Sequence, residues 1–256
     1  MPSALPHSTV IATHLEDYLS DVQDAFEQAI TNLPSSPHFR GIFKSSLAAH
    51  CALGSFAPDE LLLIRVAAGI ARRIPLLLAA RQVSLCYVEL RRFVDVVAWY
   101  PYFREHPVEW EEFQRNPTTA YVRETDRPIA FSAHREVGWF FGYIRERFAS
   151  EASGLVVEAT DQISTPFGEL SSHVHAAVGG TTGDLASPLD TVSPTILKAF
   201  QKTQRKILAA GTLIISGSRP NSLDLLPAVE RAYFDWLIGS EWAKHIKAGP
   251  FGIDSL

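Results

Sequence analysis

The sequence predicts an all-α protein, a multi-helix bundle whose long central helices are kinked at prolines. Three observations lead to this fold class. Apolar residues recur at spacings of three and four along most of the chain, which is the period of a helix packed on one side. The strict alternation of apolar and polar residues that marks a half-buried strand is rare. Prolines and cap-forming residues stand where the periodic runs begin and end.

The composition is that of a packed globular protein. The chain has 256 residues, of which 46% are hydrophobic and 20% are charged, a balance that separates it from disordered and fibrous chains. We therefore expect a single helical domain over residues 1–256, with residues 1–12 flexible. The formal net charge of −5 argues against a general polyanion binder, although a local basic face could still contact phosphate.

Cysteine usage and hydropathy predict a cytoplasmic protein without a membrane segment. The two cysteines, Cys51 and Cys86, lie among apolar residues and offer neither a disulfide framework nor a cysteine-rich metal site, which is typical of a reducing compartment. Residues 1–13 lack a basic region followed by an apolar one, so no secretory signal is expected. Charged residues interrupt the most apolar stretch, residues 61–97, so we expect it to form core helices.

The clearest predicted helix covers residues 13–33. Thr13 and Glu16 form a capping box, apolar residues follow at helical spacing, and Pro34 ends the run. One face of this helix is acidic, so we expect it to lie on the surface with one stripe buried.

The heart of the core is expected to be a pair of central helices. The first should begin at Pro58, because proline suits the first helical position, and should reach about Arg73. Pro75 lacks a backbone N–H and should kink or break the helix. A further helix is then predicted from residue 76 to residue 99.

The second half of the chain predicts further helices separated by prolines and polar loops. The aromatic stretch from 99 to 113 should form short helical pieces, because Pro101 and Pro107 force turns. A long polar connection, residues 116–129, is a candidate lid or binding edge, and residues 179–192 are expected to form a mobile loop. The remaining helices are predicted over residues 132–148, 155–163 with a continuation beyond an interruption at Pro166, 193–208, and 224–238, with Ser132, Ser193 and Asp224 as caps.

The first candidate site is a charged set on the predicted central helix: Arg81, Glu89, Arg91, Arg92 and Asp95. Glu89 belongs to a mostly apolar face, where an ionised carboxylate needs a partner such as Arg92. The set is either an internal ion pair that fixes the helix register or a functional acid with its arginine.

The second candidate is the segment from Glu169 to His175. His175 lies beside the hydroxyls of Ser171 and Ser172, an arrangement suited to acid or base chemistry, but equally to a histidine that is satisfied in the core. Glu169 and His173 have the spacing of metal ligands on a helix, yet a zinc site needs about three protein ligands and no third is identifiable, so no metal is predicted.

The third candidate is a basic helical face formed by Lys198, Lys202, Arg205 and Lys206, at spacings of three and four. It could contact phosphates, or it could be an ordinary solvated face. No aromatic residues of the kind that stack on bases are interleaved with it.

Several familiar catalytic motifs are absent from the sequence. It contains no GxGxxG, Walker loop, GxSxG, HExxH or CxxC motif. The common nucleotide-binding and hydrolase classes therefore lose their main support, and no cofactor is predicted.

The order of features resembles helical bacterial proteins related to the HEPN group. The matching features are the arginine- and glutamate-bearing apolar helix and the distant helix that carries Ser171, Ser172 and His175, over about the middle third of the chain. Many members of that group are ribonuclease toxins or components of phage defence. Their hallmark is an arginine and a histidine separated by four to six residues on one helix. The only pair at such a distance here is Arg127 and His134, with six residues between them, and Pro128 makes a shared helix doubtful.

The resemblance implies a cytoplasmic protein of a bacterial defence or toxin system that cuts RNA. Catalysis would then combine residues from separate helices, with His175 moving a proton and an arginine stabilising charge on phosphate. The alternative is a non-catalytic adaptor or sensor that binds a protein from the same operon or a phage component. A third possibility is a small-ligand pocket in the aromatic region. The candidate catalytic residues are Glu89, Arg92 and His175, and the candidate substrate-binding residues are Arg81, Arg91, Ser171, Ser172, Lys198, Lys202 and Arg205.

Overall fold

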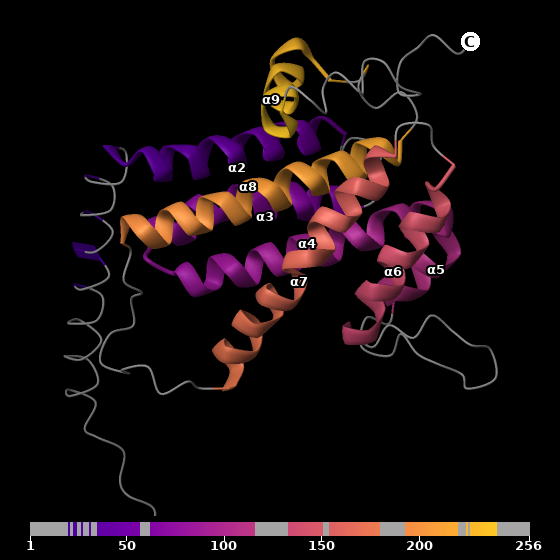
Figure 1. The fold of residues 1–256 in the computed structure, drawn as a ribbon, viewed down its shortest axis with the longest axis horizontal. Helices are drawn as coiled ribbons and strands as arrows, with labels where there is room; N and C mark the ends of the chain where they lie inside the picture. Colours follow the sequence, from indigo (N-terminus) through magenta and orange to yellow (C-terminus); the bar gives the residue numbers. More distant parts are fainter. Residues whose placement is uncertain are drawn as a thin grey trace, which may run out of the picture.

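The computed structural model confirms the all-α prediction (Figure 1). It describes residues 35–56, 62–115, 133–150, 154–179, 193–219 and 226–239, together with residues 20, 23, 24, 27, 31 and 224. Within these ranges the chain forms helices and no strand. The helices are α2 (Pro37–Phe56), α3 (Leu62–Ala79), α4 (Val83–Glu105), α5 (Pro107–Arg115), α6 (Ala133–Arg147), α7 (Leu155–Gly179), α8 (Pro194–Gly217) and α9 (Ala228–Ile238).

Helix α8 occupies the centre of the packing. It contacts α2, α4, α7 and α9, whereas α3 packs on α2 and α4. Figure 1 shows α2, α3, α4 and α8 side by side, with α7 crossing them and with α5 and α6 at one end. Over residues 194–206 one side of α8 is buried against these neighbours and the opposite side is exposed, whereas residues 207–216 are buried on all sides. The helix is therefore part of the core on one side and a surface on the other.

Helix α2 was not predicted from the sequence. Its buried face consists largely of small residues, including Ser45, Ala48, Ala49 and Ala52, which give a weak hydrophobic period. A start signal was nevertheless present. The hydroxyl of Ser36 accepts a hydrogen bond from the backbone N–H of Phe39 at 3.3 Å, just ahead of a helix that begins with proline.

A buried amide joins α2 to α8. The Nε2 of Gln204 donates to the carbonyl of Ile42 at 3.1 Å and to the hydroxyl of Ser46 at 2.7 Å, and the side chain of Gln204 is fully buried. His38 and Gln201 form a second link closer to the helix N-termini, so the two helices run parallel. Because a buried amide donor is costly when unpaired, these bonds fix the register of the two helices.

Three prolines lie inside continuous helices; for Pro75 the prediction was a kink or a break, whereas an interruption was predicted at Pro166 and a turn at Pro101. Pro75 lies within α3, Pro101 within α4 and Pro166 within α7. Each proline removes one backbone hydrogen bond. The rings of Pro75 and Pro101 are buried in the core, where apolar packing offsets that loss. The expected division into short helical pieces around Pro101 is therefore wrong, and Pro107 instead begins α5.

The actual break between the two central helices lies six residues beyond Pro75, at Arg81. Arg81 has a positive φ of 55°. The N–H of Arg81 bonds to the carbonyl of Leu78 at 3.0 Å, and the N–H of Gln82 bonds to that of Leu77 at 2.8 Å. This is a Schellman motif with arginine in the left-handed position that usually holds glycine. Arg81 thus belongs to the turn between α3 and α4 rather than to the predicted helix.

The remaining boundaries agree in part with the predictions. Ser193 caps α8 as expected, because its hydroxyl accepts from the N–H of Ile196 at 3.2 Å. Helix α8 continues beyond residue 208, the last residue of the predicted apolar stripe, and ends at Gly217. Helix α9 begins at Ala228 after Pro227, so the predicted cap at Asp224 is wrong. Most of the predicted helix 13–33, residues 1–12, residues 116–129 and nearly all of the loop 179–192 lie outside the described residues.

Gly211 permits the close approach of α8 to α4, and its replacement should destabilise the fold. A Cβ at this position would lie 2.4 Å from Cε1 of Phe93 and 2.9 Å from Cγ2 of Val97, both in the core. We expect Gly211→Ala to lower the free energy of unfolding by about 1–3 kcal/mol, since overpacked cores lose this much. Gly138→Ala is the matched control, because a Cβ at that helical glycine would meet no other atom within 4 Å. Urea denaturation of the two variants measures the difference, and equal stabilities would contradict the close approach.

The left-handed backbone at Arg81 predicts an order of stability between two truncations. Arg81→Gly and Arg81→Ala remove the same side-chain interactions, but only alanine keeps a Cβ at φ 55°. We expect the glycine variant to be more stable than the alanine variant by about 1 kcal/mol. Thermal or urea unfolding of the pair checks this order. A more stable alanine variant would show that the turn is not a Schellman motif in solution.

Candidate functional site

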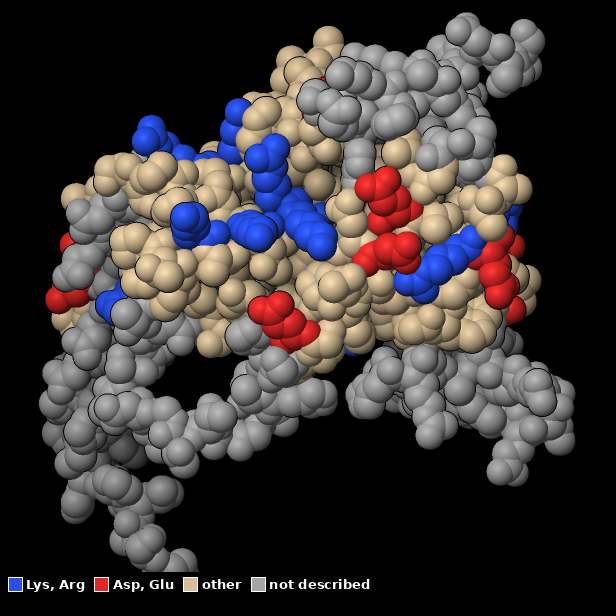
Figure 2. Space-filling model, in the orientation of Figure 1, with Lys and Arg blue, Asp and Glu red and all other residues tan. Residues whose placement is uncertain are grey.

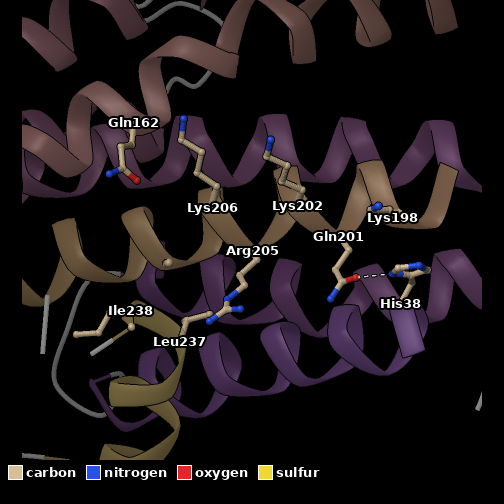
Figure 3. A pocket seen from close by; sticks show the side chains of 11 residues that line it. His38, Gln162, Lys198, Gln201, Lys202, Arg205, Lys206, Leu237 and Ile238 are labelled. Carbon is tan, nitrogen blue, oxygen red and sulfur yellow. Dashed lines mark hydrogen bonds between the residues drawn. The ribbon is translucent and has the colours of Figure 1, made fainter. Parts of the chain in front are cut away.

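A groove runs along the exposed side of α8 (Figure 3). Its volume is about 740 Å³. The outer face of α8 forms the floor, α7 borders one side, and α2 and α9 border the other. The lining residues are His38, Gln162, Lys198, Gln201, Lys202, Arg205, Lys206, Ala209, Leu237, Ile238 and Gly239.

The pattern of α8 places four cations in this groove. Lys198, Lys202 and Lys206 recur every four residues, so they stand on successive turns about 6 Å apart along the axis. Arg205 lies beside them on the same exposed side. Residues on the opposite side of the helix, among them Phe200 and Gln204, are buried. The amphipathic sequence that buries one side of the helix therefore lines up the charges on the other.

The groove is strongly basic although the chain as a whole is acidic. Among the described residues, its lining contains four cationic side chains and no aspartate or glutamate. The formal net charge of the whole chain is −5. Figure 2 shows a row of blue side chains along α8 on this face of the molecule. Such a concentration of one sign of charge in a groove attracts anions locally, whatever the net charge of the protein.

Contacts with α2 and α9 hold two polar side chains of α8, Gln201 and Arg205, in fixed positions at this border of the groove. Nδ1 of His38 lies 2.9 Å from Oε1 of Gln201. The Gln201 amide packs against Gly41 so closely that a Cβ at Gly41 would lie 1.9 Å from Nε2. The guanidinium of Arg205 lies 4.9 Å from the centre of the Trp236 ring of α9, which also contacts Lys44 at 4.1 Å. These cation–π contacts orient Arg205 without neutralising it.

The structure brings Glu89 and Arg92 together, as the sequence suggested. Oε1 of Glu89 accepts from Nη1 of Arg92 at 2.9 Å, and its Oε2 accepts from Nη2 of Arg73 at 2.9 Å. The Glu89 side chain is 13% exposed, whereas both arginines are about half exposed. Arg73, the second partner, comes from α3 and was not singled out in the sequence. Both carboxylate oxygens are therefore engaged, which is the geometry of an ion pair that fixes the register of α3 and α4.

Arg91 and Ser171 also meet, and they connect α4 to α7. Nε of Arg91 donates to the Ser171 hydroxyl at 3.1 Å, and its guanidinium lies 3.5 Å from the centre of the Phe167 ring. Arg91 also forms an ion pair with Asp95 one turn further along α4. Its side chain is only 12% exposed. The guanidinium is thus packed between helices and used for internal contacts.

The other candidate residues lie in three separate parts of the chain. Lys198, Lys202 and Arg205 gather in the groove described above. Arg81 lies in the turn after α3. The backbones of Ser172, His173 and His175 belong to α7, but their side chains lie outside the described residues. His38, Gln201 and Lys206 complete the groove, and His38 had no signal in the sequence beyond its place after the Ser36–Pro37 helix start.

The aromatic region between α4, α5 and α6 forms a packed cluster. The Tyr102 ring contacts those of His106, Trp139, Phe140 and Tyr143. Its hydroxyl donates to Glu109, and burial together with this bond raises the pKa of Tyr102 well above its ordinary value.

A second tyrosine–carboxylate pair borders the same cluster. The Tyr143 hydroxyl donates to Glu105 at 2.5 Å. Burial works to raise the pKa of Glu105, but hydrogen bonds from Tyr143 and Arg147 outweigh it and hold that pKa below its usual range. The described rings fill this corner by contacting one another, so it is part of the core.

Comparison with known proteins gives no relative. No protein-family model matches the chain, and neither curated proteins nor solved structures yield a match. Two findings concern the described residues alone. None of their helices is long and apolar enough to cross a membrane, and no group of three or more histidine, cysteine or acidic side chains is placed to hold a metal ion. The groove itself is therefore the starting point for inferring a function.

The contacts of Arg91 predict a measurable coupling between α4 and α7. We expect Arg91→Ala to lower the free energy of unfolding by about 1–3 kcal/mol, because it removes the ion pair with Asp95 and the hydrogen bond to Ser171 from a largely desolvated place. A double variant, Arg91→Ala with Asp95→Ala, should recover part of this loss. A urea-unfolding double-mutant cycle measures the coupling. Strictly additive losses would show that the ion pair contributes nothing to stability.

Proposed function

We propose that this protein binds RNA through its phosphate backbone, in the basic groove along α8. The observation that supports the proposal is the row of four cations in one groove whose described lining residues include no acid. RNA is also the ligand that the resemblance to HEPN-type helical proteins suggests, in a defence or toxin setting.

The cations of the groove are available for an anionic ligand. Lys198, Lys202, Arg205 and Lys206 are all exposed. None of the four forms an ion pair with another of the described residues. This separates them from Arg91 and Arg92, which are engaged by neighbouring carboxylates. Unpaired lysines and arginines in a row are the usual contacts for phosphates.

The shape of the charged row favours a chain of phosphates over a single one. From Lys198 to Lys206 the row spans two full turns, about 12 Å along the axis of α8. A run of charges of this length suits several successive phosphates of one strand lying along the helix. None of the described residues that line the groove is aromatic, so they offer the bases no stacking platform. We therefore expect binding that depends on charge and is indifferent to sequence.

RNA cleavage is a separate activity that the placement of Glu89 does not favour. Its two oxygens are each bonded to an arginine and its side chain is nearly buried. A general base needs to reach the proton it removes. The groove on α8, rather than the Glu89 cluster, therefore carries the proposal, and cleavage is an outcome that the same experiment can detect.

Salt dependence of RNA binding tests the proposal quantitatively. With three to four phosphates neutralised, a plot of log affinity against log salt for single-stranded RNA should have a slope of about −2 to −3. We expect Lys202→Gln and Lys206→Gln each to weaken binding and to reduce that slope by about 0.7. Fluorescence anisotropy with a labelled oligouridylate RNA measures both quantities.

The control variant is Arg72→Gln, which removes an exposed cation of α3 that does not line the groove. It should leave affinity and slope nearly unchanged. Absence of binding at low salt, or equal losses in the control and the groove variants, would overturn the proposal. Incubation of the same RNA with the wild-type protein and with His175→Ala detects cleavage. Binding of an acidic protein in place of RNA would favour the adaptor alternative.

A further inference from the structure

His38 differs from the other polar residues of the groove because its charge depends on pH. It lines the groove from the first turn of α2, beside the cations of α8 (Figure 3). Its side chain is partly exposed, so protons and ligands can reach it. Histidine is the side chain whose charge ordinarily changes between about pH 5 and pH 8.

The hydrogen bond to Gln201 determines which ring nitrogen of His38 gains and loses the proton. Nδ1 of His38 lies 2.9 Å from the amide oxygen of Gln201. An amide oxygen only accepts, so Nδ1 carries a hydrogen in both the neutral and the charged ring. In the neutral ring Nε2 is therefore an acceptor, and protonation converts it to a donor. The close packing of the Gln201 amide against Gly41 holds this bond in place.

This exchange of roles matters for an anion. A phosphate oxygen bears only acceptor sites, so the neutral Nε2 offers it no hydrogen bond, whereas the protonated ring offers both a donor and a positive charge. Figure 3 shows the second ring nitrogen of His38 directed away from Gln201. Protonation thus creates a phosphate ligand while the bond to Gln201 is kept.

The charged groups around His38 link protonation of its ring to binding of an anion in the groove. The charged side chains with which α8 lines the groove are Lys198, Lys202, Arg205 and Lys206, all of them cations. The contributions of α7 and α9 to the lining, Gln162 and residues 237–239, are uncharged, and α2 itself carries Arg40 and Lys44. A groove that already carries these positive charges attracts an anion more strongly when the His38 ring is charged as well. Binding of the anion and of the proton therefore favour each other.

We propose that His38 is a proton-dependent phosphate ligand, so that the groove binds RNA more tightly at about pH 6 than at about pH 8. The inference rests on the proposed function, because it takes the α8 groove as the RNA site.

The test compares the wild-type protein with His38→Gln and His38→Lys. Glutamine cannot carry a proton charge, and lysine carries one throughout the range of interest. The probe is an oligouridylate RNA, because neither uracil nor the phosphodiester titrates between about pH 6 and pH 8, so a pH effect belongs to the protein. Anisotropy titrations at constant low ionic strength give the affinity at both pH values.

We expect the wild-type protein to bind the RNA at least about fivefold more tightly at about pH 6 than at about pH 8. The pH effect should fall below about twofold in both variants, with His38→Lys retaining the tighter affinity at both pH values. Calorimetry in two buffers of different ionisation enthalpy should show proton uptake on binding by the wild-type protein and not by His38→Gln. A merely structural role for His38 would not produce this proton uptake.

Two further results would overturn the inference and are distinguishable from each other. If the wild-type protein binds RNA but its pH dependence persists in His38→Gln, His38 is not the titrating ligand, while the proposed function stands. If the wild-type protein fails to bind RNA at either pH even at low salt, the proposed function and this inference fail together.

Discussion

The fit of α8 against four neighbours is the constraint on which the structure depends. Its buried stripe contacts α2, α4, α7 and α9, and at Gly211 the contact with α4 leaves no space for even one additional carbon. Large apolar side chains alone would not fix the position of the helix along its axis. The buried hydrogen bonds of Gln204 to α2 supply that register, because sliding by one turn would leave a buried donor unpaired. The cations on the outer face are held in line by the same register.

The sequence predicted this helix and its basic face because both depend on local information. Ser193 and Pro194 signal the start, and the apolar period and the spacing of the lysines can be read directly along the chain. The groove could not be predicted, since its borders come from residues far apart in the sequence. His38 and Gln201, for example, are separated by 163 positions. Only the packing of α2 parallel to α8 brings them together.

The errors in the predicted helix boundaries have a common physical origin. Local rules penalise proline inside a helix by about 3 kcal/mol, and that penalty led to a predicted kink or break at Pro75 and a predicted interruption at Pro166. Tertiary packing outweighed it, and the chain turned instead at Arg81, where the sequence shows no glycine. Glu89 shows the converse case. Its need for a positive partner was predictable from its apolar surroundings, whereas its second partner, Arg73 from the neighbouring helix, was not.

Helix α8 is both a core element and the floor of the groove, so fold stability and ligand binding depend on the same helix. In many proteins these two properties depend on separate elements. A binding site on a surface loop can change without affecting the rest of the fold. Here the residues that face a ligand alternate along one helix with residues that hold the bundle together. An occupant of the groove that binds only the folded chain therefore stabilises the whole bundle by mass action. The thermal stability of the protein consequently serves as a sensor for groove ligands, so a screen by melting temperature can find them before the activity is defined.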